Sequence, residues 1–163
     1  MSLTSCKKQN TKTKKKETFN EQFVKHDYYT PSYRYVAWNL RKPFFQDKQV
    51  RKALALLINR QAIVDKLEYG LAKVISGPFF FKSPDYNNAI NPLPYDPAEA
   101  GRLLDAAGWN SRNEQGIRVK DGVEFHFTLL IPAGKRFYEQ LATSMMQDFQ
   151  KAGLSLEIQT LEW

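Results

Sequence analysis

Reactive side chains are scarce in this chain of 163 residues. Cys6 is the only cysteine, so no disulfide bond can form within the chain. The only histidines are His26 and His126, and the sequence contains no His-Glu-x-x-His motif, no Gly-x-Ser-x-Gly motif and no glycine-rich phosphate loop. A cysteine–histidine pair is not expected either, because Cys6 lies in the N-terminal tail and His126 reads as an exposed strand residue. The sequence therefore predicts a protein that is not an enzyme and uses no cofactor.

Long apolar runs and metal-binding spacings are also missing. No segment approaches the length of about 20 apolar residues that spans a bilayer. Residues Leu3–Cys6 are similar to the end of a bacterial lipoprotein signal, but no basic start and apolar run precede them. The polar loop 110–116 offers only one carboxylate, Glu114, whereas a calcium loop needs alternating oxygen ligands. We expect no metal site, and only an indirect association with a membrane.

The excess of positive charge is confined to one end of the chain. Residues 1–20 hold six lysines and one glutamate, a balance of +5 out of the net +7, so the remaining residues carry only +2. We predict that residues 1–18 are a disordered basic lead-in and that residues 19–163 form a single α/β domain. A lysine-rich tail that binds an anionic polymer is an alternative function. The nearly neutral remainder argues against a nucleic-acid partner.

The segment Asp47–Val64 has the pattern of two short packed helices. Asp47 is placed to cap the first helix, and Asn59 is placed to cap the second. Gly70 is suited to ending the second helix, because glycine adopts the left-handed backbone conformation readily. The first helix has one apolar face at helical spacing, formed by Val50, Ala53, Leu54, Leu57 and Ile58.

Aromatic residues flank these helices on both sides. Residues 33–40 alternate like a strand with two partly apolar faces, which predicts a strand covered on both sides. Residues 77–95 contain four prolines and three consecutive phenylalanines, and they fit an irregular loop with buried aromatic rings. We also expect four large aromatic side chains to belong to the core: Tyr33, Tyr35, Trp38 and Trp109.

The second half of the chain reads as helix, hairpin and β–α–β unit. Asp96 and Glu99 fit a capping box around a helix that ends at Gly108, and Asp121-Gly122 is a strong hairpin turn. A strand is expected over 123–131, in which apolar Phe125, Phe127, Leu129 and Ile131 alternate with outward-facing residues. A helix over about 135–152 and a strand over 154–161 complete the unit, for which parallel strands are the default.

Several motifs occur together in a specific order. They are Trp-Asn, Pro-Phe, Asp-x-x-Val-Arg-x-Ala-Leu, Ile-Asn-Arg-x-x-Ile-Val, Tyr-Gly-x-Ala and Gly-Pro, followed by YDPAEAGRLLDAAGW at 95–109 and a final Glu-Trp. From about Tyr33 to Trp163 the chain resembles the extracellular solute-binding proteins of family 5, the oligopeptide and dipeptide receptors of ABC importers.

The resemblance implies both a fold and a function. It implies that the chain is a fragment of the C-terminal lobe of a two-lobed, periplasmic-binding-protein-like α/β fold. It further implies peptide capture without catalysis, ABC permease subunits as partners of the full-length protein, and a location in the periplasm or on the outer face of the cytoplasmic membrane. A stand-alone interaction domain that reuses this fold is the alternative. We expect the chain alone to bind peptide weakly or not at all, since the charged residues that hold the peptide termini in the family are absent.

Two residues are candidates for ligand contact. Trp163 matches the tryptophan that lines the ligand cleft in the family, although a structural tryptophan at a strand end would look the same. Phe137, or the backbone N–H groups at the start of its helix, is the second candidate, because the loop 133–137 enters a helix near that cleft in the family.

Overall fold

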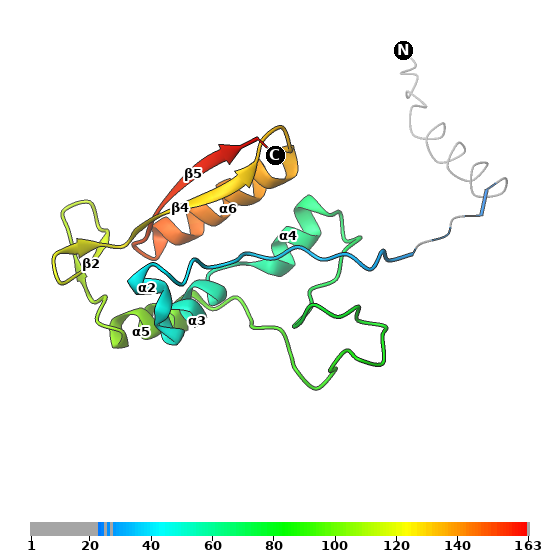
Figure 1. Ribbon diagram of the computed structural model, residues 1–163, viewed down its shortest axis with the longest axis horizontal. Coiled ribbons are helices and arrows are strands. Elements are labelled where there is room, and N and C mark those ends of the chain that lie inside the picture. The colour runs from blue at the N-terminus through cyan, green and yellow to red at the C-terminus, as the bar shows by residue number, and fades with distance from the viewer. Residues whose placement is uncertain (1–22, 25, 27, 163) are drawn as a thin grey trace, which may run out of the picture. The chain divides into compact units, whose positions relative to one another are not determined.

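The computed structural model describes residues 23–24, 26 and 28–162, and divides the chain into two units, 1–31 and 32–163. The predicted basic lead-in, residues 1–18, lies outside the described residues. The second unit contains all the helices and strands described below (Figure 1). In chain order these are α2 (Pro43–Gln46), α3 (Lys48–Leu56), α4 (Arg60–Leu67), α5 (Pro97–Ala106), β1 (Ser111–Arg112), β2 (Arg118–Lys120), β3 (Val123–Glu124), β4 (His126–Pro132), α6 (Arg136–Lys151) and β5 (Ser155–Leu161).

The C-terminal part is the predicted β–α–β unit. Strands β4 and β5 pair in parallel, in a register that runs from His126 opposite Ser155 to Pro132 opposite Leu161. Helix α6 connects them and packs against both strands (Figure 1). Phe127 and Ile131 of β4 are buried, as is Phe125 just before the strand, while the alternate residues His126, Thr128 and Leu130 are exposed. The predicted alternation is therefore confirmed.

A small antiparallel sheet precedes this unit. Strands β1, β2 and β3 pair in that order, and the turn between β2 and β3 is the predicted hairpin. Asp121 and Gly122 both adopt positive φ, 52° and 76°, as the tight two-residue turn requires. The strand expected over 123–131 is divided at Phe125, because β3 and β4 belong to different sheets.

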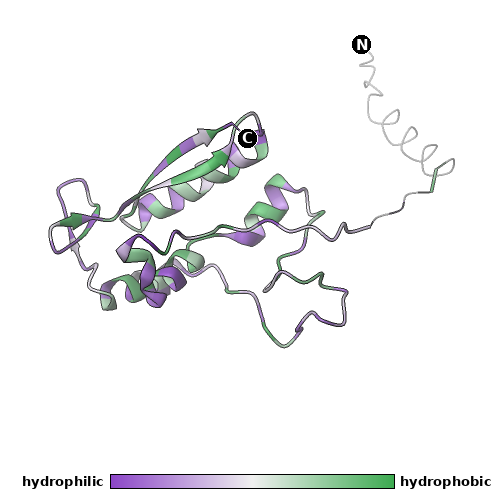
Figure 2. Cartoon of the chain, in the orientation of Figure 1, coloured by the Kyte–Doolittle hydropathy of each residue, from purple (hydrophilic) through white to green (hydrophobic). Residues whose placement is uncertain are grey.

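The predicted helix pair is confirmed together with its caps. The Asp47 carboxylate accepts from the Gln49 N–H at 2.7 Å, and the Asn59 side chain accepts from the Ala62 N–H at 3.0 Å. Helix α3 packs on α5, and the residues of the predicted apolar face are all buried. Figure 2 shows apolar and polar residues interspersed along the helices. Sequence reasoning missed Leu56, which is buried although it lies off that face. The second helix ends as expected, with Gly70 at a φ of 75°.

Only half of the predicted capping box of α5 is present. Asp96 accepts from the Glu99 N–H at 2.9 Å, which is the expected cap. The Glu99 carboxylate does not reach back to the Asp96 N–H. It pairs with Arg102 at 2.6 Å, and the Asp96 N–H donates to the Leu56 carbonyl at 3.0 Å. The tertiary contact with α3 thus replaces the local one.

The strand predicted over 33–40 is wrong. This segment runs extended, but it pairs with none of the described strands. Val36 and Trp38 pack against the core, whereas the Tyr33 and Tyr35 side chains are 49% and 75% exposed. The two tyrosines are therefore not core residues, and Trp109, which is buried, is. Alternation favours an extended backbone, but a strand also needs a neighbouring edge to bond to.

The loop 77–95 is irregular, as predicted, but its aromatic rings are not buried. Phe79 is exposed, and Phe80 and Phe81 are half-buried, with their ring centroids 5.1 Å apart. The Lys73 ammonium lies 4.3 Å from the centroid of the Phe81 ring. Phe79 is exposed and the other two rings are only half-buried, so the expectation of buried aromatic rings in this loop is wrong.

Candidate ligand-binding site

The carboxyl ends of the two parallel strands meet at one edge of the sheet. There the Ala133 N–H donates to the Leu161 carbonyl at 2.9 Å, which holds the loop after β4 beside the end of β5. In open α/β sheets, ligands bind outside the carboxyl ends of the strands. Both candidate residues follow this edge, because Phe137 comes after β4 and Trp163 comes two residues after β5. Trp163 lies outside the described residues, so its role stays a prediction.

Phe137 lies in the first turn of α6 and is half-buried. Its ring meets the Tyr138 ring edge-on, with centroids 5.4 Å apart. The Arg34 guanidinium lies over the Phe137 ring, 4.3 Å from its centroid, and is held there by an ion pair with Glu68, next to the end of α4. One face of Phe137 is therefore covered by a cation. Sequence reasoning missed Arg34, since no local pattern links residues so distant in the chain.

The N-terminus of α6 has no side-chain cap. Lys135 occupies the capping position, and its carbonyl accepts from the N–H groups of Tyr138 and Glu139 at 2.9 and 3.3 Å. The positive end of the helix dipole thus lies at the same edge as Phe137. This edge therefore combines an aromatic ring, a paired arginine and a helix N-terminus, all of which can contact a ligand.

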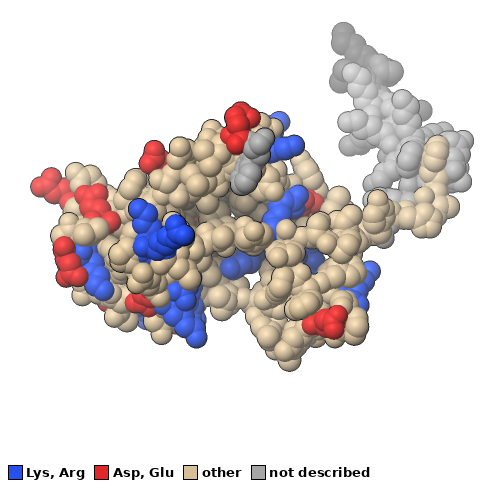
Figure 3. Space-filling model, viewed as in Figure 1, with Lys and Arg blue, Asp and Glu red and all other residues tan. Residues whose placement is uncertain are grey.

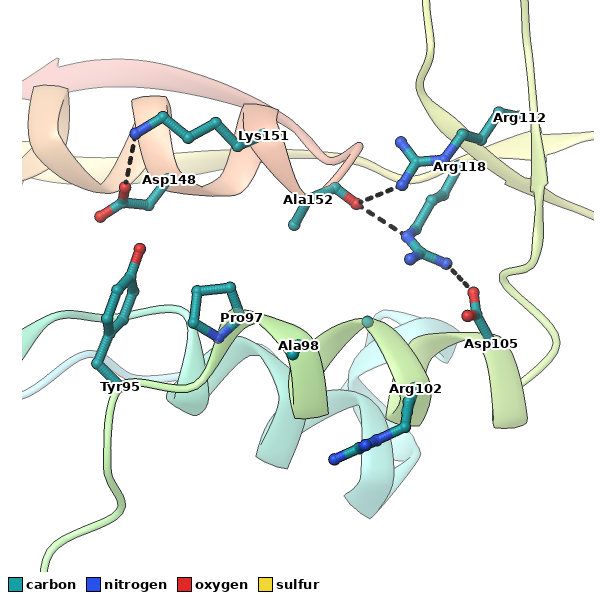
Figure 4. Close-up of a pocket in the computed structure, with 11 residues that line it drawn as sticks. Tyr95, Pro97, Ala98, Arg102, Asp105, Arg112, Arg118, Asp148, Lys151 and Ala152 are labelled. Carbon is teal, nitrogen blue, oxygen red and sulfur yellow. Dashed lines mark hydrogen bonds and ion pairs between the residues drawn. The ribbon is translucent and has the colours of Figure 1, made fainter.

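A groove lies at the opposite end of α6, away from Phe137. It has a volume of about 370 Å³ and separates α5 from the C-terminal turns of α6 (Figure 4). Its lining consists of Tyr95, Pro97, Ala98, Gly101, Arg102, Asp105, Arg112, Arg118, Asp148, Lys151 and Ala152. Sequence reasoning did not identify this groove, because its residues come from four separate parts of the chain.

Arg118 connects the walls of this groove. Its side chain is 6% exposed, and its Nε donates to the Ala152 carbonyl at 2.8 Å. Its Nη1 donates to the Asp105 carboxylate and to the Trp109 carbonyl. One guanidinium therefore ties the end of α5 to the end of α6. These hydrogen bonds also explain how a charged side chain can be buried here, because each one compensates part of the cost of removing the guanidinium from water.

Tyr95 and Asp148 face each other across the groove (Figure 4). Partial burial raises the pKa of the Tyr95 hydroxyl, and the nearby Asp148 carboxylate raises that pKa further, partly opposed by Lys151. Lys151 pairs with Asp148 at 3.2 Å. The Tyr95 hydroxyl is consequently held in its neutral form, as a hydrogen-bonding group at the rim.

His126 lies on exposed strand surface, with Nδ1 2.9 Å from the Ser155 hydroxyl and Nε2 3.7 Å from the Glu157 carboxylate. Within the described part of the chain, no three His, Cys, Asp or Glu side chains gather as a metal site would require. None of the described helices is long and apolar enough to cross a membrane. On the face shown in Figure 3, basic and acidic side chains are interspersed.

Comparison with known proteins shows which family this chain is similar to. Residues 4–163 match the family described as bacterial extracellular solute-binding proteins, family 5 Middle. The oligopeptide-binding protein AppA of Bacillus subtilis is 34% identical over 134 residues, which are 81% of this chain and 25% of AppA. Di/tripeptide-binding protein 1 of Pseudomonas aeruginosa is 33% identical over 133 residues, 79% of this chain and 22% of that protein.

Solved structures show the same likeness. The structure of Bacillus subtilis AppA in complex with a nonapeptide matches with a TM-score of 0.73 and 33% identity, covering 77% of this chain and 25% of AppA. NikZ of Campylobacter jejuni in complex with Ni(L-His) matches with a TM-score of 0.70 and 28% identity, covering 77% of this chain and 25% of NikZ. The expected α/β class is confirmed, and the chain spans about a quarter of the length of these relatives, as a part of one lobe would.

Proposed function

Because this chain belongs to family 5 of the bacterial extracellular solute-binding proteins, we propose that it forms one wall of the ligand cleft in a peptide receptor of an ABC importer. The receptor captures its ligand without catalysis, outside the cytoplasmic membrane, and delivers it to the permease subunits. The observation that carries this proposal is the edge at which β4 and β5 end, where the Ala133–Leu161 hydrogen bond holds the loop that leads to Phe137 beside the end of β5.

Peptide is the ligand class that this edge supports best. An extended peptide is bound by aromatic rings that make broad apolar contact, together with groups that pair with the charged termini of the peptide. Phe137 supplies such a ring, and the uncapped N-terminus of α6 supplies positive potential beside it, whereas the charge of Arg34 is already paired with Glu68. The relatives named for oligopeptides and di/tripeptides favour the same class, and the nickel–histidine complex of NikZ marks the competing one.

The proposal predicts weak binding by this chain alone. One wall of a cleft buries little of a peptide, and closure of two lobes supplies most of the burial. A dissociation constant of about 1 mM, equivalent to about −4 kcal/mol, is the expected order of magnitude. The test is a titration of the isotope-labelled chain with a mixed oligopeptide pool, followed through the backbone amide signals by nuclear magnetic resonance.

We expect the pool to shift the signals of residues 133–138 and 161–162. Phe137→Ala should weaken binding by about fivefold, the loss that one aromatic contact brings. Phe79→Ala is the matched control, because Phe79 is exposed on the loop 77–95 and should leave binding unchanged. Shifts that map to residues 77–95, or a Phe137→Ala variant that binds like the wild type, would refute the proposal. Micromolar binding would contradict the one-wall geometry.

The lysine-rich tail offers a separate test of the alternative function. Deleting residues 1–18 should leave the peptide-induced shifts unchanged and should abolish any binding of the chain to a polyanion such as heparin at moderate salt. Polyanion binding that persists without the tail would show that the nearly neutral remainder carries an anionic-polymer site.

A further inference from the structure

We propose that the groove between α5 and the C-terminal end of α6 binds a small oxyanion, a phosphate or a carboxylate, through Arg118. The site is independent of the peptide cleft. Helix α6 has 16 residues and is therefore about 24 Å long, and Phe137 lies in its first turn whereas Asp148, Lys151 and Ala152 lie at its other end. At about 370 Å³ the groove has room for an ion with several waters, since one water takes about 30 Å³.

The Arg118 guanidinium has a donor nitrogen left over. Its Nε and Nη1 are used by Ala152, Asp105 and Trp109, but Nη2 donates to no acceptor among the described residues. In Figure 4 this nitrogen, the one without a dashed line, points into the space between the two helices. A guanidinium fixed on two nitrogens and open on the third is already oriented for an anionic oxygen.

Gly101 keeps the approach to that nitrogen open. Glycine is unfavourable inside a helix relative to alanine, and Gly101 lies within α5. The backbone does not require it, because Gly101 is not among the residues with positive φ. A Cβ built at this position would lie 3.7 Å from Arg118 Nη2, in ordinary contact. A methyl group there would fit the fold and would cover the nitrogen, so the missing side chain is explained by access.

The charges around the groove favour an anion. Four basic residues line it against two acidic ones, Asp105 and Asp148. Asp105 pairs with Arg118, and Asp148 pairs with Lys151. Arg112 reaches the same Ala152 carbonyl as Arg118, at 3.3 Å, and so brings a second guanidinium to the C-terminal rim. Arg102 contributes least, because it turns away to Glu99 (Figure 4).

The competing explanation is that both arginines only cap α6. Its last carbonyls carry a partial negative charge, which two guanidinium groups at Ala152 would satisfy without any ligand. Capping explains the bonds of Arg118 Nε and of Arg112. Capping leaves Nη2 to water and does not explain the glycine in the facing helix.

The test is a titration of the full chain with inorganic phosphate, followed by backbone amide signals, with sodium chloride at equal ionic strength as the reference. Acetate replaces phosphate in a second arm, which distinguishes the two oxyanions. We expect saturable shifts at Gly101, Ala152 and Gly153 with at least one of them and none with chloride. Arg112→Gln should weaken binding at least about tenfold, the effect of losing one charge-assisted hydrogen bond.

Gly101→Ala separates binding from folding. It should raise the midpoint of thermal unfolding, because alanine is the better helix former, and abolish the oxyanion-dependent shifts. Arg51→Gln is the control for losing an arginine that holds backbone carbonyls elsewhere, those of Phe45 and Gln46, and should bind like the wild type. No saturable shift in the wild type, or wild-type binding by both Gly101→Ala and Arg112→Gln, would overturn the proposal and leave capping as the explanation.

Discussion

Replacing Arg118 with methionine tests how much of the fold depends on one buried guanidinium. Methionine keeps the apolar stem and removes every hydrogen bond of the head. The Trp109 carbonyl then loses the Arg118 donor, while the Ala152 carbonyl keeps only Arg112 at 3.3 Å. Asp105, whose side chain is 54% exposed, returns to water at little cost.

The expected loss follows from those partners. A buried acceptor left unsatisfied costs about 1–3 kcal/mol, so one fully and one partly abandoned carbonyl together cost about 3 kcal/mol. With a urea dependence of about 2 kcal/mol/M, the unfolding midpoint should fall by about 1.5 M.

Urea unfolding of the full chain, followed by circular dichroism, measures this shift. Arg102→Met is the matched control, because Arg102 also pairs with a carboxylate but is 73% exposed, and an exposed pair contributes less than about 1 kcal/mol. An Arg118→Met variant within about 1 kcal/mol of the wild type would refute the claim that Arg118 ties α5 to α6.

Three further predictions concern the same half of the molecule. Gly153→Ala should lower the free energy of unfolding by about 2–3 kcal/mol in urea unfolding, because Gly153 has a φ of 83° and its Cβ would lie 2.9 Å from the Gly116 carbonyl oxygen. Asp96→Ala should cost about 1 kcal/mol in the same assay, through loss of the α5 cap. The Tyr95 hydroxyl should titrate above the ordinary value near pH 10 in ultraviolet absorbance, and Asp148→Asn should lower its pKa. Since the folded-state pKa is raised, the stability linked to Tyr95 is present below pH ~10 and is lost as pH rises through the folded-state pKa.

The local elements of this fold could be predicted because their signals are local. The caps at Asp47, Asn59 and Asp96, the turn at Asp121-Gly122 and the alternation along β4 each depend on residues within a few positions of one another. They form as the sequence predicts.

Elements that depend on a distant neighbour could not be predicted in the same way. Residues 33–40 have a strand pattern, but whether they pair depends on an edge elsewhere in the chain. The Glu99 side chain does not bond to the Asp96 N–H, because that N–H donates to the carbonyl of Leu56, a residue distant in the chain. Tyr33, Tyr35 and the phenylalanines of the loop 77–95 are aromatic residues that composition alone assigns to the core, but composition does not show what covers a side chain.

Within the candidate site, too, residues that a local motif or the family resemblance indicates could be predicted, and residues from distant segments could not. Phe137 is a candidate through the resemblance to the family, and it lies in the first turn of α6, after the end of β4; its contact with a ligand stays a prediction. Arg34 and Glu68, which cover its ring, come from other segments and carry no motif. The groove at Arg118 is likewise built from residues that no sequence spacing connects.

The central claim is that peptide contacts the edge where β4 and β5 end. The most direct measurement is photo-crosslinking of the full chain with an oligopeptide pool that carries a benzophenone side chain, with the adducts located by mass spectrometry. The account predicts adducts at residues 133–138 and 161–163, reduced in Phe137→Ala and unchanged in Phe79→Ala. Adducts confined to residues 77–95 or to the groove at Arg118 would contradict it.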